Sequence, residues 1–158
     1  MEFDHCPDVR LAAPEDFWGV VELVKEAGKE DAQHPVNPEK VVSMLSRYYE
    51  KQGVLLAVIG EVGKPVAYCL SLLDPIWYSD DWQILELSLF VSKDHRKSTY
   101  AKQLMGFMKA ASEGLGLDLT IGVLSNERTE AKIRLYKRQY RQAGAYFTYH
   151  PSSADANT

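Results

Sequence analysis

Three apolar runs in the middle of the chain, residues 54–59, 66–73 and 84–91, constrain its fold more than any other feature. Each run is shorter than a typical buried helix and is bounded by turn-forming or polar residues, which is the pattern of buried strands. A short turn at 61–65 separates the first two runs, which therefore predict a hairpin. The third run is rich in leucine and predicts a long central strand.

Helical patterns lie on both sides of these strands. Apolar residues recur at helical spacing over 14–27, where Pro14 suits the first turn and Gly28 is a candidate stop. A polar loop is expected over 29–36, and the Asn-Pro pair at 37–38 predicts the start of a second helix. The remaining expected elements are a strand at 9–11, a helix at 98–115, a strand at 117–124, a helix at 128–141 and a strand at 143–149.

This order of elements, β-α-α-β-β-β-α-β-α-β, predicts one α+β domain with a mixed central sheet flanked by helices. The helix at 98–115 is long enough to cross over the sheet, so the strand after it is expected to pair in parallel. The domain is expected to cover residues 1–150. The small polar residues at 151–158 predict a flexible tail.

The composition excludes several classes of protein. With 46 % hydrophobic and 25 % charged residues in a chain of 158, it is typical of a soluble globular domain. We find no apolar run that could cross a bilayer, and the N-terminus lacks the character of a signal peptide, so a cytoplasmic protein without membrane contact is expected. Cys6 and Cys69 are expected to be reduced, and the four scattered histidines predict no metal site.

The charge of the chain is unevenly distributed. A net charge of −4 disfavours general nucleic-acid binding. Residues 93–102 and 128–141 nevertheless hold ten of the 18 basic residues, whereas residues 1–51 hold eleven acids against six bases. The pattern indicates one region suited to an anion and another suited to a cation.

The junction at 91–101 carries the strongest functional signal. A buried strand ends at Val91 and a helix is expected from Ser98, with three cations between or beside them: Lys93, Arg96 and Lys97. The unpaired amides and the positive dipole end of a helix start attract anions, and the cations add full charges. The junction therefore predicts a diphosphate site, with a basic helix start that binds no cofactor as the alternative.

The segment Arg96-Lys97-Ser98-Thr99-Tyr100-Ala101 resembles the acetyl-coenzyme A loop of the GNAT family of N-acetyltransferases, Gln/Arg-x-x-Gly-x-Gly/Ala. The run at 86–91 resembles the family's fourth strand, and the order of elements resembles the family's fold. The family's central glycine is Thr99 here. Glycine permits positive φ and close approach to a phosphate, so Thr99 must take an ordinary conformation or weaken coenzyme A binding. The hydroxyls of Ser98 and Thr99 are expected to donate to phosphate as partial compensation.

A second resemblance lies further along the chain. Asn126, Ala131 and the Leu135-Tyr136 pair resemble the family's Asn-x-x-Ala-x-x-Leu-Tyr pattern, with two more residues before the alanine. The resemblance implies that Asn126 lies near the pantetheine arm and that Tyr136 protonates the departing thiolate. Tyr140, one helical turn later, is the alternative acid. Packing of both tyrosines in the core or at its rim is the structural alternative.

The resemblance implies transfer of an acetyl group from acetyl-CoA, as co-substrate and without a metal, to a primary amine by direct attack. The pantetheine arm is expected to bond to the backbone of Leu89, Phe90 and Val91, in a gap that opens where Val91 ends. Glu86, or an ordered water, is the candidate base, and an acid within this strand is costly to bury unless it is used or solvated. Alternation places Glu86 on the face opposite Leu87 and Leu89 unless a bulge intervenes.

The acceptor pocket is expected to combine the polar loop after the first helix with aromatic residues from the loop before the third apolar run. These residues are Glu30, Asp31, His34, Trp77, Tyr78 and Trp82. The acids would steer a cationic amine, either a small molecule or a protein amine. The resemblance also allows a homodimer. Two alternatives remain: a catalytically inactive module of this fold that binds or inhibits a partner, and binding of an acidic partner or, less favoured, nucleic acid through the basic last helix.

Overall fold

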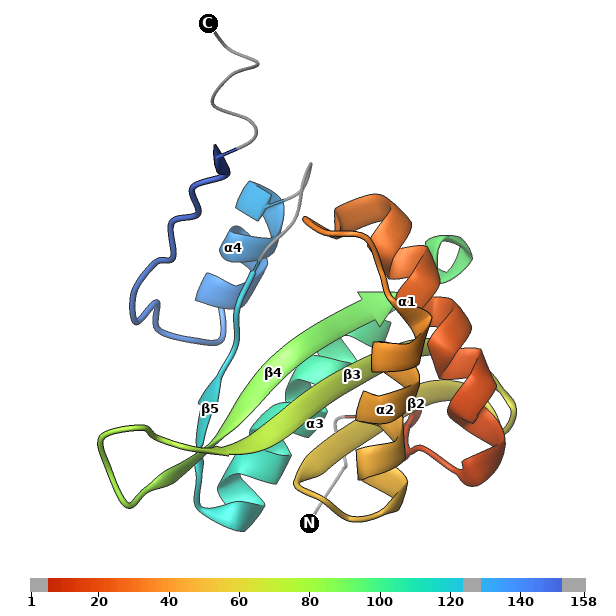
Figure 1. Ribbon diagram of the computed structural model, residues 1–158, viewed down its shortest axis with the longest axis horizontal. Helices are drawn as coiled ribbons and strands as arrows, with labels where there is room; N and C mark the ends of the chain where they lie inside the picture. Colours follow the sequence, from red (N-terminus) through yellow and green to blue (C-terminus); the bar gives the residue numbers. More distant parts are fainter. Residues whose placement is uncertain (1–5, 124–128, 152–158) are drawn as a thin grey trace, which may run out of the picture. The chain divides into compact units, whose positions relative to one another are not determined.

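The computed structural model describes residues 6–123 and 129–151, which belong to two compact units that divide after Glu127. The first unit contains a mixed sheet with strand order β1-β2-β3-β4-β5 (Figure 1). Its strands are β1 (Val9–Leu11), β2 (Val54–Glu61), β3 (Lys64–Pro75), β4 (Trp82–Val91) and β5 (Asp118–Thr120). Its helices are α1 (Phe17–Asp31), α2 (Pro38–Tyr49) and α3 (Tyr100–Leu115), with short 3-10 turns at Pro14–Asp16 and Lys93–His95. The second unit contains α4 (Thr129–Lys137).

The first four strands form an antiparallel meander, and β5 joins β4 in parallel after the α3 crossover. The expected hairpin of the first two apolar runs is therefore confirmed as β2 and β3. The central strand of this order is β3 rather than β4, although the third apolar run was expected to be central, and β4 keeps only a short contact with β5. The α+β class and the mixed sheet are both as the sequence predicts.

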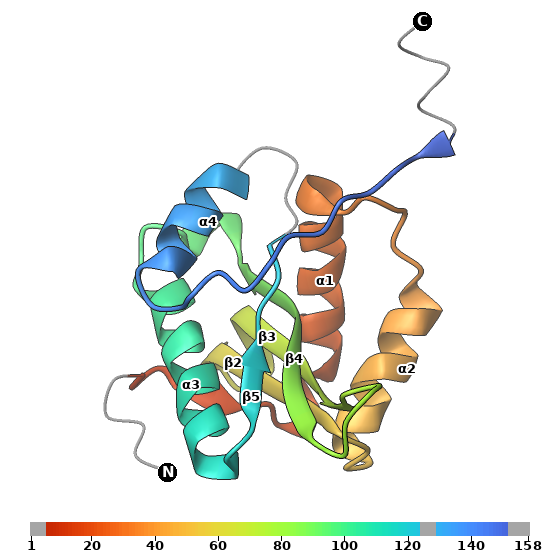
Figure 2. The same ribbon diagram turned by 90° about the vertical axis from the view of Figure 1, so that its left-hand side faces the viewer.

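The helices of the first unit cover both faces of the sheet, as Figure 2 shows. On one face, α1 and α2 enclose a core of residues that are almost fully buried: Val20, Val21, Leu45, Leu56, Val58 and Tyr68. On the other face, α3 encloses a second core: Ala57, Ile59, Cys69, Ile84, Leu104 and Met108. Alternate side chains of β2 and β3 enter alternate cores, which is the period of two expected for a sheet covered on both sides.

Helix α1 continues beyond the expected stop at Gly28 and includes residues expected to be loop. A Cβ atom at Gly28 would lie 2.2 Å from Cγ2 of Val36, so glycine here permits close packing of the 35–38 segment rather than ending the helix. Asn37 caps α2 as expected, since its side chain accepts the amides of Glu39 and Lys40. The expected helix stop was wrong because a tertiary contact explains the glycine.

The expected last strand at 143–149 is not a strand in this structure. Within the described part of the second unit, residues 141–150 have no helix or strand, and α4 ends at Lys137 instead of reaching Arg141. The apolar content of 143–149 suits a strand, but a strand exists only where a neighbour pairs with its backbone. Asn126 and the tail after Pro151 lie outside the described residues.

Cys6 and Cys69 are both buried free thiols in the α3-side core, so no disulfide joins them. Among the described residues, we find no helix long and apolar enough to cross a membrane. The same residues bring together no group of three or more histidine, cysteine or acidic side chains that could hold a metal ion.

Candidate functional site

The strands β4 and β5 pair over only a short stretch, from Gln83 opposite Asp118 to Leu85 opposite Thr120. Beyond Leu85, β4 continues to Val91 and no strand of the described chain pairs with it on that side. A gap therefore opens in the sheet, as expected, but it begins after Leu85 rather than where Val91 ends.

The backbone of β4 presents unused hydrogen-bonding groups to this gap. The Ser92 amide donates to the Val66 carbonyl of β3 at 2.9 Å. Bonded and non-bonded pairs alternate along an antiparallel ladder, so Leu89 and Val91 direct their peptide groups away from β3 and toward the gap. The Val91 carbonyl accepts from Arg96 Nε at 3.2 Å. Within residues 6–123 and 129–151, this leaves the Leu89 peptide groups and the Val91 amide for another chain or ligand.

A β-bulge changes the direction of Glu86. The register of β3 and β4 shifts between Leu70 and Ser71, which leaves Leu87 as the extra residue. Glu86 is therefore on the same face as Leu89, the face covered by α3, and only 9 % of it is exposed. Glu86 also follows Leu85, the last β4 residue that pairs with β5, so it lies at the closed end of the gap.

The loop between β4 and α3 follows directly from the open edge. Thr99 has φ −89° and ψ 10°, so the position that is glycine in the family pattern takes an ordinary conformation here, as the sequence requires of a threonine. The first bond inside α3 runs from the Gln103 amide to the Thr99 carbonyl at 2.9 Å. Within the described residues, the exposed loop and first turn offer unpaired amides at Lys97, Thr99, Ala101 and Lys102.

The two hydroxyls expected to bind phosphate differ in their availability. The Ser98 hydroxyl donates to the His95 carbonyl and accepts the Tyr100 amide, so its proton is already in use. The Thr99 hydroxyl accepts from Gln103 Nε2 at 2.9 Å and keeps its own proton for a ligand. Tyr100 stacks on His95, with ring centroids 6.2 Å apart, and packs against the α3-side core.

The cations of the loop also divide into two kinds. Arg96 is turned toward α1, where it pairs with Glu30 and lies 5.5 Å from the ring centroid of Phe90. Phe90 itself is buried in the core under α1 and α2, and its peptide groups face β3 rather than the gap. Lys97 and Lys102 are exposed beside the unpaired amides, and they supply the charge that an anion would meet.

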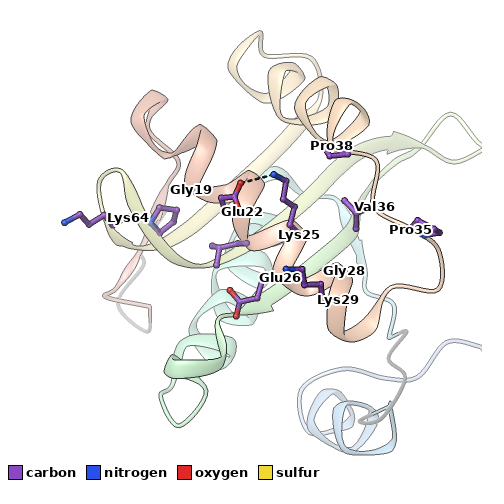
Figure 3. A pocket seen from close by; sticks show the side chains of 12 residues that line it. Gly19, Glu22, Lys25, Glu26, Gly28, Lys29, Pro35, Val36, Pro38 and Lys64 are labelled. Atoms are coloured by element: carbon purple, nitrogen blue, oxygen red, sulfur yellow. Dashed lines mark hydrogen bonds and ion pairs between the residues drawn. The ribbon is translucent and has the colours of Figure 1, made fainter.

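A groove of about 810 Å³ runs along α1, between the turn after β2 and the 35–38 segment (Figure 3). Lys25 pairs with Glu22 at 2.9 Å, and Glu26 is bonded to the loop after β4. Within the described chain, we find no acidic partner for the two other lysines of the groove, Lys29 and Lys64. The groove therefore does not favour a cationic amine.

The residues expected to bind the acceptor do not come together. The first group, Glu30, Asp31 and His34, lies at the end of α1 and just after it, where Glu30 contacts Arg96. His34 is exposed. Trp77 and Tyr78 form the exposed tip of the β3–β4 hairpin, and Trp82 begins β4, at the opposite end from Val91. A strand rises about 3.3 Å per residue, so about 30 Å separates the two groups. One small acceptor cannot contact both.

The expected acid lies in the second unit. Tyr136 and Tyr140 are both half-buried, and their rings form an edge-to-face contact with centroids 6.4 Å apart. The Tyr140 amide donates to the Tyr136 carbonyl at 2.8 Å, so the two share one face of the chain as the sequence predicts.

Glu26 is a residue of this site that sequence reasoning missed. Its carboxylate accepts the Lys93 amide at 3.1 Å and the Ser92 hydroxyl at 3.1 Å. The signal for it was the row of Glu22, Glu26 and Glu30, which spacing of four places on one helical face. An acidic row usually faces solvent, and only the fold shows that two of its members contact a basic loop.

Comparisons with known proteins identify the family and the fold of the chain. The model of the acetyltransferase (GNAT) family matches residues 19–140. The chain belongs to the GNAT family. Membership supports acyltransferase activity in general, and members of the family generally use acetyl-CoA. No curated protein matches the chain.

Several solved structures share this GNAT fold. A ribosomal-protein-alanine N-acetyltransferase from Brucella melitensis biovar Abortus 2308 is 15 % identical, with a TM-score of 0.68 over 90 % of this chain and 96 % of that one. An aminoglycoside acetyltransferase from an uncultured soil metagenomic sample is 17 % identical, with a TM-score of 0.67 over 91 % and 97 %. A putative acetyltransferase from Agrobacterium tumefaciens str. C58 is 18 % identical, with a TM-score of 0.70 over 90 % and 98 %. Identities this low establish the fold alone.

Proposed function

We propose that the protein is an N-acetyltransferase that moves the acetyl group of acetyl-CoA to a primary amine. The observation that carries this proposal is that two surfaces with unpaired backbone groups follow each other directly along the chain. The open edge of β4, at Leu89 and Val91, leads directly into a loop with unpaired amides from Lys97 to Lys102. The first surface suits an extended chain with amide groups and the second suits a diphosphate, which are the two parts of coenzyme A in that order.

In this proposal the diphosphate binds to the loop amides, with Lys97 and Lys102 nearby and with the Thr99 hydroxyl as a further donor. The pantetheine arm passes the Val91 amide first and then the Leu89 peptide groups, and it reaches toward the closed end of the gap. The Leu89 amide, which lies nearer to Glu86, is therefore the candidate donor to the thioester oxygen, where negative charge develops as the amine attacks. Asn126 remains a proposed contact of the pantetheine arm.

Direct attack by the acceptor agrees with the state of the cysteines. Burial and the nearby Glu86 charge raise the pKa of the Cys69 thiol well above its ordinary value. Burial also raises the pKa of Cys6. Thiolates, rather than thiols, are the nucleophiles in acyl transfer, so neither cysteine suits a covalent acetyl-enzyme. The amine itself then forms the new bond, and Glu86 or a water bonded to it removes the proton.

The acceptor is proposed to enter from the end of α1, near Glu30, Asp31 and His34. This end of the helix lies beside the open edge of β4, because Arg96 bonds to both Glu30 and the Val91 carbonyl. The aromatic hairpin tip lies at the other end of β4 and is not part of this acceptor site. The proposal leaves the acceptor's size open, from a small amine to a protein lysine or N-terminus.

The test is release of free thiol from acetyl-CoA in the presence of polyamines, aminoglycosides, amino acids and lysine peptides. We expect release that depends on one amine class, and binding of coenzyme A that calorimetry detects at micromolar concentration. Reactions without amine give the background hydrolysis. No heat at high micromolar coenzyme A would refute the transferase and favour the inactive binding module.

A further inference from the structure

Two carboxylates of α1 contact the loop that leaves β4. Glu26 Oε1 accepts the Lys93 amide at 3.1 Å, and its two oxygens lie 3.1 and 3.3 Å from the Ser92 hydroxyl that donates to them. One helical turn later, Glu30 forms an ion pair with the Arg96 guanidinium. The spacing of four residues places both carboxylates on the same face of α1.

The contacts of Glu26 are at the point where the chain leaves the sheet. The Ser92 amide still belongs to the β3 ladder, through its bond to the Val66 carbonyl, whereas the Lys93 amide begins the 3-10 turn. Hydrogen bonds to an ionised carboxylate are stronger than those between neutral groups. Glu26 therefore determines the direction in which the loop starts.

The contacts of Arg96 fix the far side of the same turn. Its guanidinium meets Glu30, the Val91 carbonyl and the face of Phe90, and a quarter of its side chain is exposed. Its Nε and Nη2 are already bonded to the Val91 carbonyl and to Glu30, so turning this guanidinium toward a diphosphate would break both bonds. The unpaired amides of Lys97, Thr99, Ala101 and Lys102, in contrast, lie after this turn and can meet a diphosphate without loss of an Arg96 contact.

We infer that Glu26 and Glu30, together called the α1 clamp, are positioning residues for the cofactor loop. The clamp holds the turn from Ser92 to Arg96 so that the amides after it face the diphosphate. Arg96 links the turn to α1 through Glu30 and to the open edge of β4 through the Val91 carbonyl. The lysines, rather than Arg96, interact with the phosphate charge. This inference rests on the proposed function, and neither clamp carboxylate touches the cofactor.

The sign of a mutational effect separates the clamp from simple charge repulsion. Glu26→Ala removes the bonds to the loop and is expected to raise the Kd of coenzyme A by about tenfold, the size of effect expected for hydrogen bonds to a charged group. Glu26→Gln keeps an acceptor oxygen and is expected to stay within about threefold of wild type. If both variants lower the Kd, the carboxylate acts only by repelling the phosphate, and the clamp is wrong.

Glu22→Ala is the matched control. Glu22 lies one turn before Glu26 on the same helix, pairs with Lys25 and is 70 % exposed, so its loss is expected to leave the Kd unchanged. A Glu22→Ala effect as large as that of Glu26→Ala would assign the change to α1 as a whole and overturn the clamp.

A double-mutant cycle tests the role of Arg96. Because Glu30→Ala and Arg96→Ala remove the same ion pair, each is expected to raise the Kd of coenzyme A and the double variant to raise it less than their product. If Arg96 binds the diphosphate directly, Glu30→Ala frees it and lowers the Kd while Arg96→Ala raises it. Those opposite effects on the Kd would overturn the inference that Arg96 positions the loop without contacting the diphosphate.

Amide hydrogen exchange of Lys93 without cofactor tests the clamp apart from the proposed function. Loss of its carboxylate partner in Glu26→Ala is expected to speed this exchange at least tenfold, with little change at Ser92, which stays bonded to β3. Unchanged exchange at Lys93 would overturn the clamp even in a protein that binds coenzyme A. A wild-type protein with normal Lys93 protection and no affinity for coenzyme A would instead overturn the proposed function, and with it the clamp's role in cofactor binding.

Discussion

Glu86 of β4 lies directly opposite Ser71 of β3, and both side chains are on the α3 face of the sheet. The Ser71 hydroxyl contacts the Met108 sulfur of α3 at 3.6 Å, which fixes that face independently of the strand pattern. The bulge at Leu87 is what brings Glu86 onto the same face as Leu89. A carboxylate at the closed end of the β4–β5 gap is thus almost fully buried, and in the proposed function it is the base that accepts a proton from the amine.

We predict that Glu86→Gln lowers kcat by about a hundredfold, the lower range for loss of a general base. The amide has nearly the shape of the carboxylate, so the Kd of coenzyme A and the unfolding temperature are expected to change little. Steady-state kinetics and calorimetry on the same preparation measure both. Glu61→Gln, at the exposed end of β2, is the control. If Glu86→Gln keeps wild-type turnover, a water or another group removes the proton.

We predict that Thr99→Gly leaves the Kd of coenzyme A within about threefold of wild type, because the negative φ of Thr99 needs no glycine. The variant is expected to lose about 1 kcal/mol of unfolding free energy, since it removes the bond to Gln103 and adds backbone freedom. Calorimetry and urea unfolding measure the two quantities. If the glycine variant binds coenzyme A tenfold more tightly, the threonine side chain obstructs the phosphate.

The sequence was sufficient for the parts of this fold that local patterns determine. Apolar runs with short turns predicted the hairpin and β4, and helical spacing with a proline predicted α1 and α2. The bulge at Leu87 was not predictable, because it exists only in the register between β3 and β4. The end of α1 was misplaced for a related reason, since the contact of Gly28 with Val36 depends on tertiary packing.

The candidate site likewise has features that the sequence predicts and features that only the tertiary structure shows. The positions of Thr99 and the loop cations could be read from the sequence, because the strand and helix next to them were visible. The orientation of Arg96 could not, since it depends on Glu30, which is 66 residues away in the chain. The expected meeting of His34 with Trp77 failed because sequence order alone does not show which end of β4 a loop occupies.

Asp16 gives the fold a defined sensitivity to acid. It is fully buried and accepts two bonds from Arg10, at 2.6 and 3.0 Å, together with the amides of Ala13 and Gly63. Desolvation raises the pKa of this carboxyl, but the bonds from Arg10 and the two amides outweigh it, so the pKa lies below its ordinary value. The ionised carboxylate therefore stabilises the folded state.

We predict that Asp16→Asn lowers the free energy of unfolding by about 2 kcal/mol at pH 7, because it weakens bonds to a charged group. A depressed folded-state pKa gives stabilisation that is complete above the unfolded-state pKa of about 3.9 and is lost as the pH falls through the folded-state value. The difference between wild type and variant should therefore shrink below about pH 4. Urea unfolding at pH 7, 5 and 3 measures it, and a constant difference at all three would contradict the assignment.

Tyr136 and Tyr140 offer the sharpest test of the chemistry, because they are a matched pair. Both are half-buried on one face of the second unit, and phenylalanine at either position keeps the ring that makes their edge-to-face contact. If Tyr136 protonates the departing thiolate, Tyr136→Phe is expected to lower kcat by about a hundredfold while the Kd of coenzyme A stays constant. Tyr140→Phe is then expected to retain nearly full turnover, because it removes a hydroxyl with no part in the reaction. A larger loss in Tyr140→Phe would move the acid to Tyr140, and full turnover in both variants would mean that the thiolate leaves without a tyrosine proton.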